Sequence, residues 1–187
     1  IAPASSSVTN DMLSGSIATS KLADGSTFAT TNGIAMSDLW RQSAITAINA
    51  ATDTDLTANW EQPDGDSFGG IGTAMSQSSG IFTFPTTGIY LIIYNAQIHS
   101  PSQGATYAGG RINVTTDNSS YSVASEGYAS IYHSNGYGLA TTYHQFDVTS
   151  TSTHKIKFSV VCEFASDVRG STDQNRTCVQ FIRLGDT

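Results

Sequence analysis

The sequence has few charged residues, few cysteines and no long apolar run, and each of these features argues against one class of protein. Only 12% of its 187 residues are charged, and 15 Asp and Glu outnumber 8 Lys and Arg. Because no basic cluster occurs, the composition argues against nucleic acid as a partner. No apolar run approaches the ~20 residues that a membrane helix needs. We therefore predict no nucleic-acid binding and no membrane insertion.

The two cysteines, Cys162 and Cys178, are too few for a disulfide framework and lack the spacing of a metal site. They flank the loop 165–176, each within a strand-like segment, so a disulfide between them is one geometric option that depends on the redox compartment. The 4 histidines have no Cys, Glu or second His at ligand spacing. We therefore predict no metal site from them.

Catalytic signatures are also missing. The chain has no Gly-x-Ser-x-Gly elbow and no Gly-rich phosphate loop. Asp64 and Asp66 flank Gly65 behind a proline, which is typical of a turn rather than of a glycosidase acid pair. Asp53 and Asp55 lie in a polar loop, and we interpret them as solvated. We predict no enzyme and no cofactor; a bound calcium stays open, although no loop has dense alternate carboxylates.

Glycine, serine and threonine are abundant instead, with enough apolar residues for a core. This composition favours an all-β domain with many turns. Residues 40–45, WRQSAI, fit a short strand, although the apolar residues around them also recur at helical spacing. Roughly eight to ten antiparallel strands predict a jelly-roll sandwich. The candidate strands from Phe68 onward are 68–75, 81–84, 88–98, 110–116, 121–132, 138–148, 154–164 and 177–184.

The strand 88–98, GIYLIIYNAQI, is apolar on both faces near its start. A strand of a two-sheet protein needs only one apolar face for the core. On the other face Ile89, Leu91 and Ile93 precede the polar Asn95 and Gln97. We expect this second face to be dry near Gly88, wetter toward His99, and covered by something outside the sandwich.

Residues 1–33 differ from the predicted head at 34–187. They contain two imperfect copies of one unit, VTNDMLSGS (8–16) and IATSKLADGS (17–26), each with too few apolar residues to fold alone. We interpret this segment as a neck that trimerises or anchors the chain; a flexible Ser/Thr linker is the alternative. Because the chain does not begin with Met, we expect a fragment or a processed product.

Two segments, GIFTFPTTGIYLIIYNAQI (80–98) and VQFIRLGD (179–186), resemble the TNF-like and complement-globular-head jelly rolls. The neck repeats, with DLWRQ, ANWE and GTAMSQSSG, are similar to fibre and appendage proteins of tailed phages, particularly cyanophages. The resemblance implies a homotrimer with heads packed around a threefold axis on a virion. It places Ile89, Leu91, Ile93 and Phe181 at the trimer interface. The alternative is that a loop or the neck covers this face within one chain.

Tyrosines are concentrated between residues 107 and 143, among Ser, Gly, Asn and Ala. A large rigid ring beside adaptable polar groups is the mixture that antibody combining sites use, and tyrosine rings also stack on apolar faces and hydrogen-bond through their hydroxyl. We hypothesise that loops of this region contact a host surface glycan or protein. The alternative places these rings in the trimer interface. The candidate receptor-binding residues are Tyr128, Tyr132, Asn135 and Tyr137.

These observations predict a virion structural protein that attaches to host cells. A capsid decoration or tail-neck protein that docks on other virion proteins through its N-terminal segment is the first alternative. A polysaccharide-degrading appendage would need an acid pair that the sequence does not offer. Similar heads also cap collagen-like filaments, but no Gly-X-Y run occurs in this chain.

Overall fold

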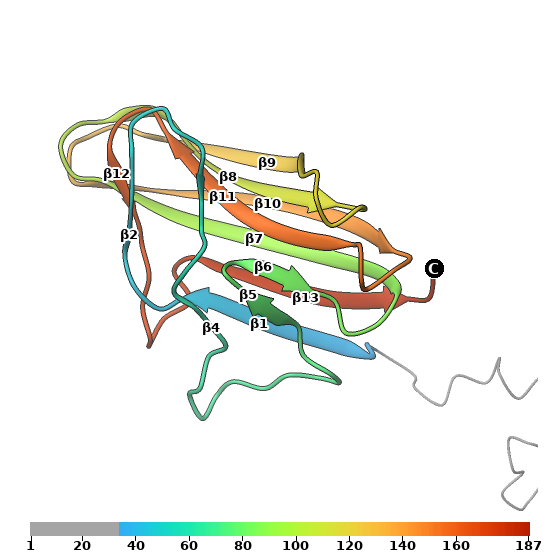
Figure 1. Ribbon diagram of the computed structural model, residues 1–187. Helices are drawn as coiled ribbons and strands as arrows, with labels where there is room; N and C mark the ends of the chain where they lie inside the picture. Colours follow the sequence, from blue (N-terminus) through green and yellow to red (C-terminus); the bar gives the residue numbers. More distant parts are fainter. Residues whose placement is uncertain (1–33) are drawn as a thin grey trace, which may run out of the picture. The chain divides into compact units, whose positions relative to one another are not determined.

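The computed structural model describes residues 34–187 (Figure 1). The predicted neck, with both repeats, lies outside the described residues. Within the described part every regular element is a β-strand, so no helix that could cross a bilayer is found there. The predicted all-β class is confirmed.

The described residues form thirteen strands. This number exceeds the predicted eight to ten because six strands have only two or three residues. The long strands are β1 (Met36–Gln42), β7 (Gly88–Ser100), β8 (Ala105–Thr115), β9 (Ser122–Ile131), β10 (Gly136–Val148), β11 (Lys155–Cys162) and β13 (Cys178–Gly185). The short strands are β2 (Thr46–Ile48), β3 (Thr54–Asp55), β4 (Trp60–Glu61), β5 (Ser76–Ser78), β6 (Ile81–Thr83) and β12 (Ser166–Val168).

Two antiparallel sheets form a sandwich (Figure 1). Sheet A runs β2-β12-β7-β13-β1-β4, with β10 also paired to β7. Sheet B runs β5-β6-β11-β8-β9, with β3 paired to β11. The closing strand β13 lies between β1 and β7, which precede it by many residues. Such long-range strand crossings are typical of the predicted jelly roll.

The inward face of β7 supplies the centre of the core. Tyr90, Ile92 and Tyr94 are fully buried, as the alternation of the sequence predicts. Across the sandwich, the Tyr94 ring lies 4.8 Å from the Phe158 ring of β11, centroid to centroid. The Phe82 ring lies 5.3 Å from that of Trp60. Burying each such side chain contributes about 1.5–3 kcal/mol to folding.

Phe181 belongs to this core, so its predicted place at a trimer interface is wrong. Its side chain is fully buried, and its ring lies 5.3 Å from Phe82 and 6.0 Å from Phe158. The strand register decides this: β13 pairs Phe181 with the inward Ile92. Directly opposed residues share one face of a sheet. The next residue, Ile182, is the one that points outward.

Two local predictions also need correction. Residues 68–75 form a loop that is joined to β1 by a bridge between Ile71 and Ser37 and by a hydrogen bond of 2.8 Å from the Met75 amide to Asp38 Oδ2. Gly72 has a positive φ of 69°, and a Cβ there would lie 2.3 Å from the Ala35 carbonyl oxygen. Gly72 therefore serves a tight turn instead of a strand. The strand predicted at 40–45 forms only through Gln42.

Candidate binding surfaces

The outward face of sheet A carries an apolar strip, defined by Ile89, Leu91, Ile93, Tyr143 and Ile182. The register places these side chains together, because Leu91 pairs with Ile182 and Ile93 pairs with Tyr143. The isoleucines and the leucine are half-buried, whereas Tyr143 is 71% exposed. The strip is therefore an apolar surface open to a partner, and Ile89, Leu91 and Ile93 lie where the sequence predicts them.

The same face becomes polar toward the Ser100 end of β7. Thr141 Oγ1 donates a hydrogen bond of 2.8 Å to Asn95 Oδ1. Further along, the His99 ring stacks on the Tyr137 ring with centroids 4.7 Å apart. His99 Nδ1 lies 3.5 Å from the Asp167 carboxylate. The outward face of β7 thus has an apolar end and a polar, aromatic end.

The four candidate receptor-binding residues separate into two places. Tyr132, Asn135 and Tyr137 lie in or beside the turn between β9 and β10, and Tyr132 is 86% exposed. Asn135 adopts a left-handed conformation with φ of 54°, which fits its role in a tight turn. Tyr128 lies instead on β9 in sheet B.

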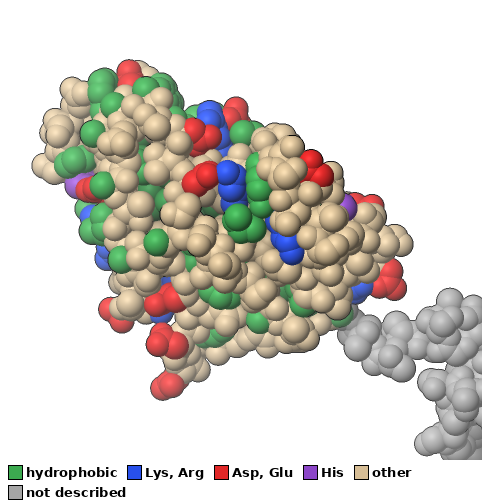
Figure 2. Space-filling view, in the orientation of Figure 1, with side chains coloured by type: hydrophobic (Ala, Val, Ile, Leu, Met, Phe, Trp, Pro, Cys, Tyr) green, Lys and Arg blue, Asp and Glu red, His purple; other side chains and the backbone are tan. Residues whose placement is uncertain are grey.

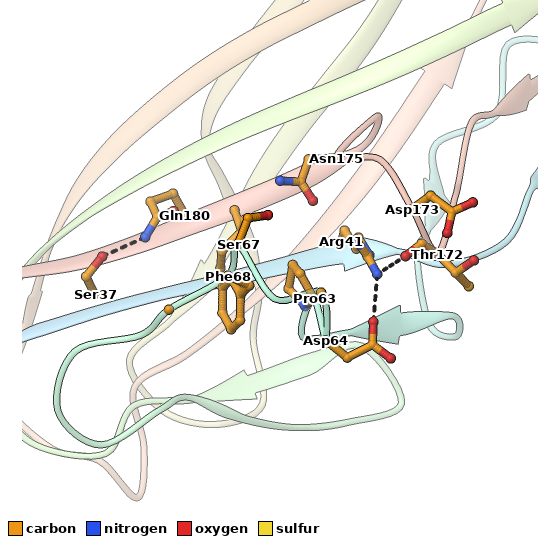
Figure 3. A pocket seen from close by; sticks show the side chains of 13 residues that line it. Ser37, Arg41, Pro63, Asp64, Ser67, Phe68, Thr172, Asp173, Asn175 and Gln180 are labelled. Carbon is orange, nitrogen blue, oxygen red and sulfur yellow. Dashed lines mark hydrogen bonds and ion pairs between the residues drawn. The ribbon is translucent and has the colours of Figure 1, made fainter.

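A hollow of about 450 Å³ at the β1 edge of sheet A is organised by Arg41 (Figure 3). Arg41 is 4% exposed. Its guanidinium lies 2.8 Å from the Glu61 carboxylate and 3.2 Å from that of Asp64, and also donates to the Thr172 carbonyl oxygen. The arginine therefore ties two loops together, and its charge is neutralised within the chain. Asp64 serves as an ion-pair partner at this turn.

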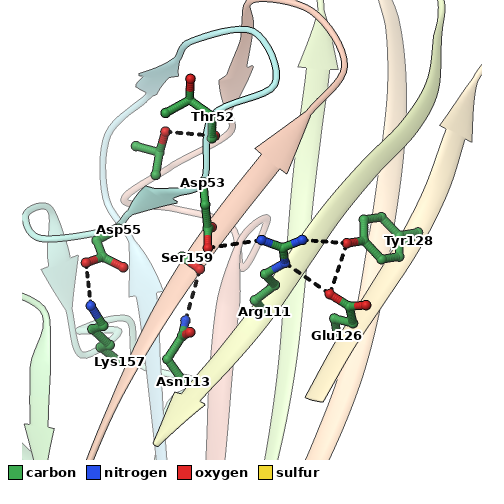
Figure 4. A network of polar contacts seen from close by, with 10 residues as sticks. Thr52, Asp53, Asp55, Arg111, Asn113, Glu126, Tyr128, Lys157 and Ser159 are labelled. Atoms are coloured by element: carbon green, nitrogen blue, oxygen red, sulfur yellow. Dashed lines mark hydrogen bonds and ion pairs between the residues drawn. The ribbon is translucent and has the colours of Figure 1, made fainter. Parts of the chain in front are cut away.

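A second arginine organises the outward face of sheet B (Figure 4). Arg111 Nη1 lies 3.0 Å from the Asp53 carboxylate, and its Nε lies 3.1 Å from that of Glu126. Its Nη2 donates to the Tyr128 hydroxyl at 2.8 Å. Partial burial acts to lower the pKa of Arg111, but the hydrogen bonds with Tyr128 and Asp53 outweigh it and raise the pKa. Tyr128 and Asp53 therefore belong to one internally satisfied network.

This network borders a shallow hollow of about 500 Å³. The Tyr107 ring meets the Tyr128 ring edge to face, with centroids 6.3 Å apart. Asp55, which the sequence suggests is solvated, pairs with Lys157 at 2.6 Å. In the space-filling view several Lys and Arg side chains lie beside acidic ones (Figure 2). On the outward face of sheet B, Arg111 and Lys157 both have carboxylate partners.

Both cysteines are free thiols, so the considered disulfide does not form in this structure. Cys162 is part of the core between the sheets, and its Sγ accepts a hydrogen bond of 3.3 Å from Ser166 Oγ. Cys178 pairs with Asn95, on the outward side of sheet A. Burial raises the pKa of the Cys178 thiol, and the hydrogen bond from Asn95 acts in the opposite direction. The two side chains point to different environments.

Ionisable groups give no sign of a metal or acid–base centre in the described part. Among residues 34–187, no three His, Cys, Asp or Glu side chains are grouped to hold a metal ion. Asp117 is the one carboxyl there with a resolved shift. The Ser120 amide, the Thr115 hydroxyl and the Ser119 amide donate to it and lower its pKa. A hydrogen-bonded turn carboxylate of this kind has a structural role.

The sequence matches no protein-family model and no curated protein. Its fold is nevertheless similar to solved structures. Murine APRIL is 15% identical with a TM-score of 0.58, covering 80% of this chain and 98% of that one. Eiger TNF from S. frugiperda is 8% identical with a TM-score of 0.60, covering 83% and 96%. The PRD1 vertex protein P5 is 14% identical with a TM-score of 0.50, covering 82% and 99%. At these identities the likeness establishes a TNF-like jelly roll and nothing further.

Proposed function

We propose that this chain is the head of a homotrimeric virion appendage that attaches the particle to a host surface. The apolar strip carries the proposal of a trimer. Ile89, Leu91 and Ile93 form an apolar row on the outward face of β7, beside the exposed Tyr143. A row that a single chain leaves open is stabilised when another copy covers it, and soluble homo-oligomers usually close by rotational symmetry.

Two observations support a virion location. The sequence pattern of residues 1–33 resembles the neck segments of phage fibres, although no family model or curated protein matches the chain, and the PRD1 vertex protein, by its name a component of a virion vertex, has a similar fold. The proposed role is non-catalytic, with other virion proteins binding the N-terminal segment.

Attachment is proposed for the turn between β9 and β10. Tyr132 and Tyr137 expose 86% and 57% of their surface there. Exposed tyrosines offer a rigid apolar ring and a hydroxyl for hydrogen bonds, which suits binding to a glycan or protein surface. The capsid decoration alternative uses the same fold but needs no such exposed rings.

The test combines a mass measurement with cell labelling. Light scattering after size exclusion gives the mass of the assembly, and three times 19.7 kDa is expected. Fluorescently labelled protein is then incubated with a panel of cyanobacterial strains. We expect labelling of at least one strain, and weaker labelling by a Tyr132→Ala/Tyr137→Ala variant of unchanged mass. A monomeric mass contradicts the trimer, and a trimer that labels no strain favours the decoration role.

A further inference from the structure

Most cationic side chains of the described part have a carboxylate partner. The chain is acidic, with a net charge of −7. Lys155 has no carboxylate partner among the described residues; its ammonium group donates to the Thr83 hydroxyl and the Thr151 carbonyl oxygen. Within residues 34–187, Arg169 and Arg176 form no ion pair. The paired cations are Arg41, Arg111, Lys157 and Arg183.

These two arginines line the same hollow. It measures about 390 Å³ and is bordered by Gln97 of β7, Tyr137 of β10 and the loop after β12, which supplies Arg169, Gln174 and Arg176. The Arg169 amide donates to the Gln97 carbonyl oxygen at 2.8 Å, which anchors the loop to β7. The positive charges therefore converge on a surface that the strands hold in place.

Arg169 is incompletely satisfied. Its Nε is buried and has no hydrogen-bond partner among the described residues. Its guanidinium carbon lies 6.0 Å from the centroid of the Tyr137 ring, a weak cation–π contact. The nearby Asp167 pairs with His99 and not with Arg169. No described residue accepts a hydrogen bond from the other guanidinium nitrogens either, and unlike Nε these nitrogens are accessible, so they are available to an acceptor supplied from outside.

From this we infer that the hollow between Tyr137, Arg169 and Arg176 binds the carboxylate of an acidic sugar. The planar guanidinium presents paired N–H groups that match the two oxygens of a carboxylate. Arg176 Nε donates to Gln174 Oε1 at 3.2 Å, so Gln174 offers its remaining amide N–H groups, and Gln97 its side-chain amide, to ring hydroxyls. Tyr137, with 57% of its surface exposed, offers an aromatic ring to the apolar side of a pyranose.

The volume of the hollow lies within the range of small-molecule sites. That the carboxylate belongs to a sugar rests on the proposed attachment function. The contact between the arginines and a carboxylate does not depend on that function. Gln97 and Tyr137 lie on the same outward face as the apolar strip. The competing occupant is therefore an acidic side chain of a second copy of this chain, and the experiment separates the two.

The experiment titrates the full chain with tetragalacturonate and with maltotetraose in a calorimeter. We expect saturable binding of the uronate alone, at one site per subunit. Binding should weaken as salt rises, because screening acts on a partly exposed ion pair. Arg169→Ala and Arg176→Ala should each weaken it at least about tenfold. Arg169→Lys keeps the charge but loses the planar fork, so it should also weaken binding.

Lys157→Ala is the matched control, because it removes one positive charge from the outward face of sheet B. It should leave uronate affinity unchanged. Equal binding of maltotetraose, or binding only of a sulfated heparin tetrasaccharide, would overturn the assignment. If the parent chain binds no uronate and the Arg169→Ala/Arg176→Ala variant has a lower assembly mass, the two arginines contact a second copy of the chain instead.

The outcomes also separate this inference from the proposed function. If the chain labels cells but binds no uronate, attachment stands and the acidic-sugar site fails. If the chain binds uronate through Arg169 but labels no strain, the site stands and host attachment fails. Circular dichroism of each variant checks that it is folded, and Arg169→Lys tests the site if an alanine variant does not fold.

Discussion

The outward faces of the two sheets differ in whether their side chains have partners within the chain. On sheet B, Arg111 is surrounded by Asp53, Glu126 and the Tyr128 hydroxyl. On sheet A, Ile89, Leu91 and Ile93 are covered by no second layer of the described residues, and Arg169 has no carboxylate partner among them. The charges around Arg111 on one face are paired within the chain, and we propose that the other face binds a partner.

The protein has few charged residues, and the difference shows that Arg111 and Lys157 on sheet B are paired within the chain, whereas Arg169 is not. Surface ion pairs contribute little stability individually, but cross-strand pairing keeps opposite charges adjacent and avoids unpaired ones. The apolar row on the other face would reduce solubility unless something binds there. Four predictions test the surroundings of side chains on the two sheets.

The largest effect is expected from Ile93→Asp. A carboxylate placed in the apolar strip would be buried without a partner in each copy, at a cost of several kcal/mol per ion. The proposed trimer should dissociate, as light scattering would show. The matched control is Val123→Asp on β9, where the valine is 46% exposed. If Val123→Asp also dissociated the assembly, or Ile93→Asp did not, the two faces would not differ as described.

Neighbouring residues of β13 test the two sides of sheet A. Phe181→Ala removes a fully buried ring, so it should lower the free energy of unfolding by about 3–5 kcal/mol. Ile182→Ala, on the outward side, should cost less than about 1 kcal/mol in a monomeric Ile93→Asp background. Urea unfolding of both variants measures this. Equal losses would mean that Phe181 and Ile182 do not face opposite sides.

A smaller contrast is expected between the arginines. Arg111→Ala removes the donor to the Asp53 carboxylate and the Tyr128 hydroxyl, while Glu126 keeps the hydrogen bond from the Tyr128 hydroxyl, and all of these groups are partly exposed and screened by solvent. We expect a loss of about 1 kcal/mol. Arg169→Ala should cost nothing measurable, because no described residue bonds its guanidinium. Urea unfolding in the monomeric background compares them, and a larger loss for Arg169→Ala would contradict the contrast.

The smallest effect concerns the inward side of sheet A, where His144 pairs with Ile92. Burial lowers the pKa of His144. The unfolded chain, with an ordinary histidine pKa of about 6.5, then binds the proton more tightly than the folded chain. Stability is therefore full above that pH and falls as the pH drops through it. His144→Gln should flatten this part of the stability profile between pH 7 and 5, and an unchanged slope would refute the assignment.

Much of the fold could be predicted from local patterns. The alternation at 88–98 correctly separates the buried Tyr90 and Ile92 from the outward Ile89 and Leu91. Period-two alternation depends only on neighbouring residues, so the sequence contains it directly. The alternation is not decisive at 179–184 (VQFIRL), because apolar residues occupy both faces there. The pattern alone does not say whether Phe181 or Ile182 points inward. The glycine-rich segment 68–75 has the apolar pattern of a strand, but its backbone forms a turn.

The candidate sites depend on distant residues. Nothing local in the sequence marks Arg169 and Arg176 as a site, and the available signal is that both fall in the loop 165–176 of a chain with few charged residues. Likewise, Asp53 and Tyr128 lie 75 residues apart, and nothing local indicates that Arg111 joins them. Asn135 and Tyr137 could be placed near one turn because they are close in sequence, although Tyr137 lies at the start of β10 and only Asn135 lies in the turn.

By itself the amino-acid sequence determined the strand class, the surplus of apolar surface on β7 and the scarcity of charge, since these follow from composition and short-range periodicity. Only the tertiary structure decided which charges are compensated. Strand register brings Arg111 to Glu126 across neighbouring strands and leaves Arg169 and Arg176 at a hollow beside Tyr137. Register depends on pairings between segments far apart in the chain, and for that reason no local pattern specifies on which outward face the charged side chains are paired within the chain.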